Sequence, residues 1–350
     1  MVQTAYRVLF FIIMQKIYDI GQVPRRDKPA ERFMFPFSQI NYLVNGGCFD
    51  RVTLITSSSD NGKSTFCSQI ICSIIEQGYK VCAFFGEDDP YETQERIYKQ
   101  SLKNNGNDDM SYIPFYVNGK ETNCGEWILN DDAWKKAHEK FKNKLFLYNT
   151  KASASVDDIL QGFDEARIKN GCKVFLLDNV DQFEFSSENE NKALKDIIIK
   201  IRDYAINNHV HIFLICHIRK MERDVILPNM FDVKGTSSIV NISKNVLIIV
   251  RMDKVDHESK EYKRLKKIVE LNNYDLDEAD CLVYVAKTKG RKIGYACLKF
   301  NKKLGLFYDC KKIDENKEEI EKAQVVIPQT INGFTAIENA DLVFEEDFFS

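Results

Sequence analysis

One stretch of the sequence limits the architecture of the chain more than any other. Residues 52–56 read Val-Thr-Leu-Ile-Thr, which predicts a buried β-strand. The polar loop SSSDNGKST follows, and residues 64–77 then carry apolar side chains at the spacing of one helix face. Because a strand joined so closely to a helix needs a sheet to pair in and a face to cover, the chain is predicted to be an α/β protein.

The same alternation continues along the chain. Further strands are predicted at residues 80–85, 145–148, 174–177, 211–216, 246–250 and 282–286, and further helices at 90–102, 156–169 and 192–207. Strands separated by helices of about 10–15 residues indicate βαβ units and a mostly parallel sheet flanked by helices. Residues 103–143 are predicted to be polar and irregular, with a helical piece near 134–141. Ligands of such a sheet bind beyond the carboxyl ends of its strands.

Composition excludes several classes of protein. The 350 residues are 44% hydrophobic and 29% charged, which excludes a collagen-like, low-complexity or wholly disordered chain. The formal net charge is -3, so that any nucleic-acid site must be a local basic patch. The 10 cysteines include no CxxC pair and no Cys/His cluster, which argues against a zinc site and predicts a reducing compartment, the cytoplasm.

Three segments interrupt the alternation. Residues 8–14 (VLFFIIM) are too few for a membrane span of about 20 residues and lack the flanks of a signal peptide. We therefore expect residues 1–35 to form an apolar helix, buried or covered by a neighbouring subunit, and a linker. The charged residues 253–280 are predicted to be a solvated surface insertion. Residues 313–350 are predicted to be an acidic tail with phenylalanines, either a solubilising end or a segment that binds a partner.

The serine-rich loop departs at one position from the phosphate-binding pattern G-x-x-x-x-G-K-[ST]. Ser57 stands where the first glycine is expected, whereas Gly62, Lys63 and Ser64 match. A glycine lets the backbone approach phosphates, the lysine reaches the β- and γ-phosphates, and the serine hydroxyl can bind Mg²⁺. The predicted nucleotide-binding residues are Ser57, Ser58, Ser59, Asp60, Asn61, Gly62, Lys63, Ser64 and Thr65.

Three further groups follow predicted strands and are expected at the same sheet edge. Asp178 ends an apolar run and is predicted to bind the metal ion. Glu87 is a candidate for polarising the attacking water, a role worth about 10²–10⁴ in rate. His217 directly follows a strand, where a histidine can report whether a γ-phosphate is present. A basic cluster on the next loop is a candidate for binding a nucleic-acid backbone: Arg219, Lys220 and Arg223.

The order of these motifs resembles the RecA-type motor domain of DnaB-like replicative helicases, and the phage primase–helicases and Twinkle-like helicases most of all. The resemblance covers roughly residues 36–310, and the motor domain is assigned to residues 36–312. The matching segments are Gly46-Gly47, the SSSDNGKST loop, LLDNVDQ, ICHIRK, DVKGTSSIVNISKNVLIIVR and AKTKGRKIGYACLKF. It implies a RecA-like P-loop NTPase fold with a C-terminal β-hairpin. It also implies a ring-shaped, ATP-dependent 5′–3′ DNA helicase and single-stranded DNA translocase acting in replication. ATP, or another NTP or dNTP, and Mg²⁺ would bind at the interfaces of a homo-oligomer, a hexamer in the family.

Carried over by position, the resemblance assigns Lys63 and Ser64 to phosphate and Mg²⁺, and Asp178 to support of the metal. Glu87 takes the place of the water-activating carboxylate, and His217 takes the place of the family's sensor histidine. The loop that holds the basic cluster takes the place of a loop that lines the ring's channel and contacts single-stranded DNA.

Two motifs depart from the family pattern. In the stretch that corresponds to D-L-R-G-S-G-x-x-x-Q, Lys234 replaces the arginine and is expected to contact DNA. Asn241 replaces the closing glutamine, which puts the coupling of nucleotide to DNA in doubt. The arginine-finger pattern K-x-R reads here as a lysine at Lys289, with Arg291 two residues later. An arginine finger accelerates hydrolysis by about 10³–10⁵. Three alternatives follow: Lys289 stabilises the transition state less strongly than an arginine would, Arg291 reaches the nucleotide instead, or hydrolysis is slow.

Two other functions remain open at this point. One is a RecA-like recombinase or recombination mediator that forms filaments, and the other is a hydrolysis-impaired ATP-binding subunit of a replication machine. The short segment ahead of the motor predicts that the chain lacks a primase domain, and weakly indicates a phage or another mobile replicon. The tail would then bind a replicative polymerase, a primase or a single-strand-binding protein, and no membrane contact is expected.

Overall fold

The structure is a computed structural model. It describes residues 19–22, 25, 29–102, 109–149, 155–180, 190–218, 228–230, 232–233, 237–289, 291–313, 329–331 and 334–336. The chain divides into two units, residues 1–31 and 32–350. The described structure of the first unit is a 3₁₀ turn, η1 (Ile20–Gln22). The apolar run at 8–14 and the acidic end of the tail lie outside the described residues, and our expectations for them stay predictions.

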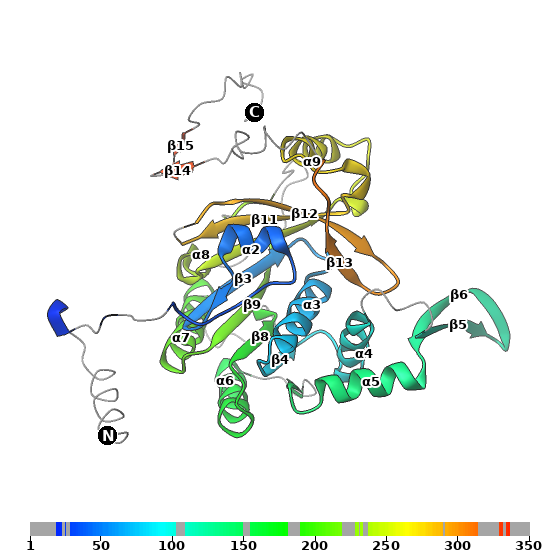
Figure 1. Ribbon diagram of the computed structural model, residues 1–350, viewed down its shortest axis with the longest axis horizontal. Coiled ribbons are helices and arrows are strands. Elements are labelled where there is room, and N and C mark those ends of the chain that lie inside the picture. Colours follow the sequence, from blue (N-terminus) through cyan, green and yellow to red (C-terminus); the bar gives the residue numbers. More distant parts are fainter. Residues whose placement is uncertain are drawn as a thin grey trace. The chain divides into compact units, whose positions relative to one another are not determined.

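A mixed sheet forms the centre of the second unit (Figure 1). Within the described residues it has nine strands in the order β13-β12-β11-β10-β3-β9-β8-β4-β7. Their bounds are Arg51–Ser57 (β3), Val81–Phe85 (β4), Leu145–Leu147 (β7), Val174–Asp178 (β8), His211–His217 (β9), Asn245–Arg251 (β10), Cys281–Thr288 (β11), Gly294–Asn301 (β12) and Leu306–Asp309 (β13). The strands from β10 to β7 are parallel, and β11 to β13 continue the sheet with antiparallel pairings. The predicted mostly parallel sheet with C-terminal hairpin strands is thereby confirmed.

Helices pack against both faces of this sheet (Figure 1). Their bounds are Ser38–Val44 (α2), Lys63–Glu76 (α3), Pro90–Ser101 (α4), Asp131–Phe141 (α5), Val156–Glu165 (α6), Glu190–Asn207 (α7), Ser237–Ile242 (α8) and Lys260–Leu271 (α9). In β4, Ala83 and Phe85 belong to the core shared with α3 and α4, whereas Cys82 and Phe84 belong to the core shared with α6 and α7. The strands are therefore buried on both faces, as their continuous apolar runs predict.

The segment predicted to be irregular contains a long β-hairpin. Strands β5 (Met110–Val117) and β6 (Lys120–Leu129) pair with each other and, among the described residues, with no other strand. Asn118 and Gly119 connect them with φ values of 52° and 75°. Two successive residues at positive φ form the tight turn that Asn-Gly favours, so this dipeptide was the signal that the sequence reading missed.

Residues 253–280, predicted to be a solvated surface insertion, pack against the sheet through one apolar side of a helix. They include α9, whose Leu265 and Val269 are buried in a small core with Leu282 of β11. Short two-residue strands β1 (Arg32–Phe33) and β2 (Gly47–Cys48) pair ahead of the sheet, and β14 (Gln329–Ile331) pairs with β15 (Phe334–Ala336). In the part of the chain that the structure describes, no helix has the length and apolarity needed to span a membrane.

Candidate nucleotide-binding site

A cavity of about 750 Å³ lies beyond the carboxyl ends of the parallel strands. The loop after β3 and the start of α3 contribute Ser59, Asp60, Gly62, Lys63, Ser64 and Thr65 to its lining. The ends of β4, β8 and β9 contribute Glu87, Asp178, Asn179 and His217. The other side is formed by Arg251, Asp253, Lys254, Phe300 and Lys302. The structure thus brings together the groups that the sequence placed at one sheet edge, because parallel strands present their carboxyl ends on the same side.

The loop between β3 and α3 has the backbone that close contact with phosphate requires. Gly62 precedes α3 with φ 74°, the left-handed region that favours glycine. The Lys63 ammonium donates to Ser57 Oγ and to the Ser58 carbonyl, at 3.2 Å each. Ser57, at the position of the expected glycine, is buried, so its hydroxyl holds the lysine inside the loop. Burial lowers the pKa of Lys63, against the opposing attraction of Asp178 and Glu87.

Ser64 and Asp178 meet beneath this loop. The Ser64 hydroxyl donates to Asp178 Oδ2 at 2.6 Å, and the aspartate is 6% exposed. Burial raises the pKa of Asp178 to about 6, although the bond from Ser64 lowers it. A hydroxyl beside a carboxylate is the hard oxygen pair that Mg²⁺ prefers, and a cation would favour the ionised carboxylate. These two residues therefore fit a magnesium ion.

Glu87 belongs to a polar group that spans three strand ends. Asn179 Nδ2 donates to Glu87 Oε1 at 2.7 Å and lies 3.0 Å from His217 Nε2. His217 Nε2 itself lies 3.5 Å from Glu87 Oε1. The Glu87 side chain is 61% exposed, which leaves its carboxylate accessible to water. Asn179 was missed by the sequence reading, although its place directly after Asp178 at a strand end was a usable signal.

Arg251 closes the cavity on the β10 side. Its guanidinium makes two bonds of 2.7 Å to Asp253, and its carbon Cζ lies 3.9 Å from the centre of the Phe300 ring. Its backbone N–H donates to Asn61 Oδ1 at 2.9 Å, so that the loop is also held from this side. The sequence reading missed Arg251, yet it ends a parallel strand next to β3, the same signal that located Asp178.

Three predicted residues lie elsewhere on the sheet. Because β11 is antiparallel to β10, with Thr288 opposite Asn245, Lys289 and Arg291 follow at the edge where β10 begins. Asn241 also precedes β10, and its carbonyl accepts a bond from Lys287 Nζ at 3.0 Å. Of the described residues that line the cavity, none is Asn241, Lys289 or Arg291. The four predicted DNA-binding residues lie outside the described residues: Arg219, Lys220, Arg223 and Lys234.

A family model for the AAA domain matches residues 22–223, more than half of the chain. The chain belongs to the AAA domain family. This AAA domain chain is 23% identical to a DNA helicase/primase of Enterobacteria phage T3 over 228 residues, which are 62% of the chain and 38% of that protein. It is 18% identical to the Twinkle homolog protein, chloroplastic/mitochondrial, of Arabidopsis thaliana over 213 residues, 57% of the chain and 28% of that protein. The chain thus spans well under half the length of these relatives.

Comparison with solved structures identifies the fold of the chain. An ATPase domain matches 89% of the chain and 99% of its own length with a TM-score of 0.61 at 16% identity. A DnaB-like replicative helicase, solved in a study of its interactions with primase, matches 87% of the chain and 70% of its own length with a TM-score of 0.60 at 17% identity. A KaiC-like protein from Pyrococcus horikoshii matches 80% of the chain with a TM-score of 0.51 at 12% identity. The predicted resemblance is confirmed: the chain is a RecA-like P-loop NTPase domain with the fold of DnaB-like helicase motors.

Proposed function

We propose that this protein is a replicative motor that hydrolyses ATP, or another NTP or dNTP, to move along single-stranded DNA and unwind duplex DNA. The observation that carries the proposal is the convergence of Lys63, Ser64, Asp178 and Glu87 on one cavity at the carboxyl edge of the sheet. A phosphate-binding loop, an oxygen pair for Mg²⁺ and an accessible carboxylate are the parts that phosphoryl transfer to water requires.

Each group has a distinct task in this reaction. Backbone N–H groups at the start of α3 and the Lys63 ammonium bind the β- and γ-phosphates. Ser64 and Asp178 hold Mg²⁺, which neutralises charge on the phosphates when it is bound. The Glu87 carboxylate, oriented by the amide of Asn179 at 2.7 Å, accepts a proton from the attacking water. His217 lies 3.0 Å from the Asn179 amide and 3.5 Å from the Glu87 carboxylate. It would respond to the state of the nucleotide through these contacts.

The position of Lys289 and Arg291 supports assembly into a ring with nucleotide sites between subunits. The eight residues of β11 separate them from the cavity edge of the same chain, roughly 25 Å at the rise of a strand. We propose that they act in the cavity of a neighbouring copy, in a homo-oligomer whose expected size is a hexamer. Asn241, near the same edge, would then transmit the state of that neighbouring site.

Single-stranded DNA is the proposed track. The strand β9 that ends in His217 leads directly into the segment with Arg219, Lys220 and Arg223, so a nucleotide sensor and a basic cluster are neighbours in sequence. With Lys234 these cations would contact the phosphate backbone. We propose action in the cytoplasm, the host cytoplasm for a phage-encoded protein. The cysteine pattern of the sequence supports this, because the ten cysteines include no CxxC pair and no Cys/His cluster.

The decisive experiment measures phosphate release from ATP with and without single-stranded DNA, on protein whose oligomeric state is determined in parallel. DNA-stimulated hydrolysis by closed rings is the expected result. Open helical filaments in negative-stain micrographs would favour a recombinase or recombination mediator instead. Nucleotide binding without hydrolysis in any oligomeric state would indicate an ATP-binding subunit and overturn the motor.

A further inference from the structure

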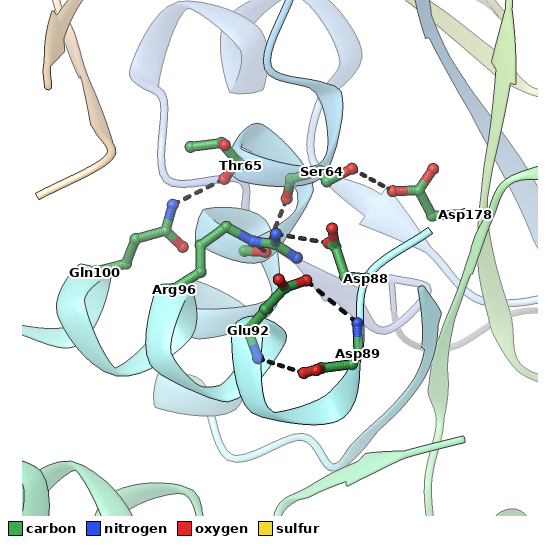
Figure 2. A network of polar contacts seen from close by, with 9 residues as sticks. Ser64, Thr65, Asp88, Asp89, Glu92, Arg96, Gln100 and Asp178 are labelled. Carbon is green, nitrogen blue, oxygen red and sulfur yellow. Dashed lines mark hydrogen bonds and ion pairs between the residues drawn. The ribbon is translucent and has the colours of Figure 1, made fainter. Parts of the chain in front are cut away.

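Helix α4 contacts α3 and the loops beside the cavity through two polar residues one helical turn apart, Arg96 and Gln100 (Figure 2). Gln100 is 2% exposed, and its amide donates to the Thr65 carbonyl at 2.8 Å and to the Gly305 carbonyl at 2.7 Å. Arg96 lies on the same side of the helix, between Gln100 and Asp88 (Figure 2). Neither residue lines the cavity among the residues described, so any effect on the reaction is indirect.

Arg96 joins two parts of the site that are distant in sequence. Its Nε donates to Ser68 Oγ at 2.9 Å, and Ser68 Oγ in turn donates to the Ser64 carbonyl at 2.7 Å. Its Nη1 donates to Asp88 Oδ2 at 2.6 Å (Figure 2). One guanidinium therefore bonds to the loop that carries Glu87 and to Ser68, whose hydroxyl bonds to the backbone of Ser64, the proposed Mg²⁺ ligand.

The loop after β4 is fixed on each side of the carboxylate that activates water. Directly after Glu87, Asp88 is bonded to Arg96, and Asp89 caps α4 by accepting from the Glu92 N–H at 2.8 Å. Directly before Glu87, the Gly86 N–H donates to the Asp178 carbonyl at 2.5 Å. The backbone of Glu87 thus lies between three anchors, and Arg96 is the one that connects it to α3.

The burial of Arg96 is a poor arrangement for stability alone. Its side chain is 19% exposed, it lies over the Phe85 ring at 4.9 Å, and its Nη2 is buried without a partner among the described residues. An unpaired buried donor opposes folding, and an apolar side chain of similar shape in place of a buried ion pair is often neutral or stabilising. Stability therefore gives little reason for an arginine at this position, whereas its two simultaneous bonds need a planar fork of donors.

We propose that Arg96 is a positioning residue that fixes the distance and orientation of Glu87 relative to Ser64, and thereby the attack of water on the phosphate bound at α3. This inference rests on the proposed ATP hydrolysis. Without the guanidinium the nucleotide still binds, because Lys63 and the loop backbone are untouched. The carboxylate then loses its fixed geometry, and a misplacement of about 1 Å costs roughly 10²-fold in rate.

The test compares Arg96→Met, Arg96→Lys and a matched control, Arg167→Met. Arg167 also pairs with an aspartate, Asp164, at 2.6 Å, but at the end of α6 and outside the cavity lining. For each variant kcat is measured per bound nucleotide, together with KM, nucleotide affinity and the midpoint of thermal unfolding. Arg96→Met is expected to lower kcat by about 10²-fold with KM and affinity changed less than about threefold. Arg96→Lys keeps one of the two bonds and should fall between Arg96→Met and the wild type.

The outcomes separate positioning from a purely structural role and from failure of the proposed function. Unchanged kcat in Arg96→Met, or equal losses of kcat and of nucleotide binding together with early unfolding, would overturn the positioning role. A loss of kcat in Arg167→Met as large as in Arg96→Met would also overturn it, because the loss of any arginine–aspartate pair would then have the same effect. If the wild-type chain binds ATP but hydrolyses none under any condition, the proposed function falls, and the inference with it.

Discussion

The cavity edge and the β5–β6 hairpin are opposite extremes within one unit of the chain. At the cavity, several polar side chains are held by bonds from another element, as Ser64 is by Asp178 and Glu87 by Asn179. In the hairpin, residues 115–117 are exposed over half of their surface, from 52% to 62%. Function is therefore expected to respond to single atoms at the cavity, whereas the hairpin tip should tolerate almost any side chain.

Within the described residues, the contacts between the hairpin and the rest of the unit lie in the half of the hairpin next to the sheet, and include the Lys99–Glu126 ion pair and Lys303 over the Trp127 ring. Met110 is buried in a small cluster with Leu304 and Leu306, and the Tyr112 and Trp127 rings pack edge to face at 5.4 Å. Beyond these contacts the ribbon is two strands wide, which is marginal for independent stability in water (Figure 1). The parallel sheet therefore fixes the positions of the side chains at its edge. The isolated β5–β6 ribbon fixes only the pairing of its own two strands. Four experiments test this contrast.

The largest effect is expected at Lys63. Lys63→Ala removes the cation that the loop presents to the β- and γ-phosphates, so hydrolysis should fall by on the order of 10³-fold or more. Phosphate release is the measurement, with circular dichroism as the control for folding. Hydrolysis within a few-fold of the wild type would show that the charge at the loop is dispensable and would contradict the site.

Glu87→Gln tests whether the carboxylate accepts the proton of the attacking water, because glutamine has nearly the same shape as glutamate. The amide can still meet the Asn179 side chain but cannot take a proton, so hydrolysis should fall by about 10²-fold or more. Nucleotide affinity should stay within a few-fold of the wild type, as measured with a fluorescent ATP analogue. Wild-type turnover in this variant would remove Glu87 from the mechanism.

Two histidines near the start of β9 differ in burial, and their effects on the pH dependence of stability are expected to differ accordingly. His211 is 1% exposed, and burial lowers its pKa to about 4. The unfolded chain binds the proton more readily, so stability is fully present above about pH 6.5 and is lost as the pH falls towards 4. The contribution of His211 to the free energy of unfolding should fall by about 2–3 kcal/mol across this window. It is measured as the difference between the wild type and His211→Gln, because the raised pKa of Asp178 acts in the opposite direction in both proteins.

The control for this experiment is the neighbouring histidine. His209 is 69% exposed and pairs with Asp50 at 2.9 Å. Exposed pairs contribute little, so His209→Asn should keep the pH dependence of the wild type. His211→Gln should flatten it between pH 6.5 and 4, as measured by urea unfolding at several pH values. Equal slopes in all three proteins would mean that the buried histidine does not titrate as its burial requires.

The sequence predicted the residues at the cavity edge better than it predicted the hairpin. Glu87, Asp178 and His217 were predictable because each lies at or directly beyond the end of an apolar strand, and parallel strands bring such residues to one edge. Arg96 was not, because it lies in a polar helix pattern, and its bonds depend on how α4 packs on α3. The hairpin was missed through its composition, since period-2 alternation is weak in a ribbon exposed on both faces.

The smallest effect is expected at the tip of the hairpin. Tyr116 is 62% exposed, so Tyr116→Ser should change the free energy of unfolding by no more than about 0.5 kcal/mol. A matched control is Tyr274→Ser, because Tyr274 is only 4% exposed and its loss should cost several kcal/mol, about 3–5. Hydrolysis by Tyr116→Ser should equal that of the wild type at every protein concentration. A loss of hydrolysis with unchanged stability would show that the tip contributes to activity through contacts outside this chain, and the contrast between the two regions would fail.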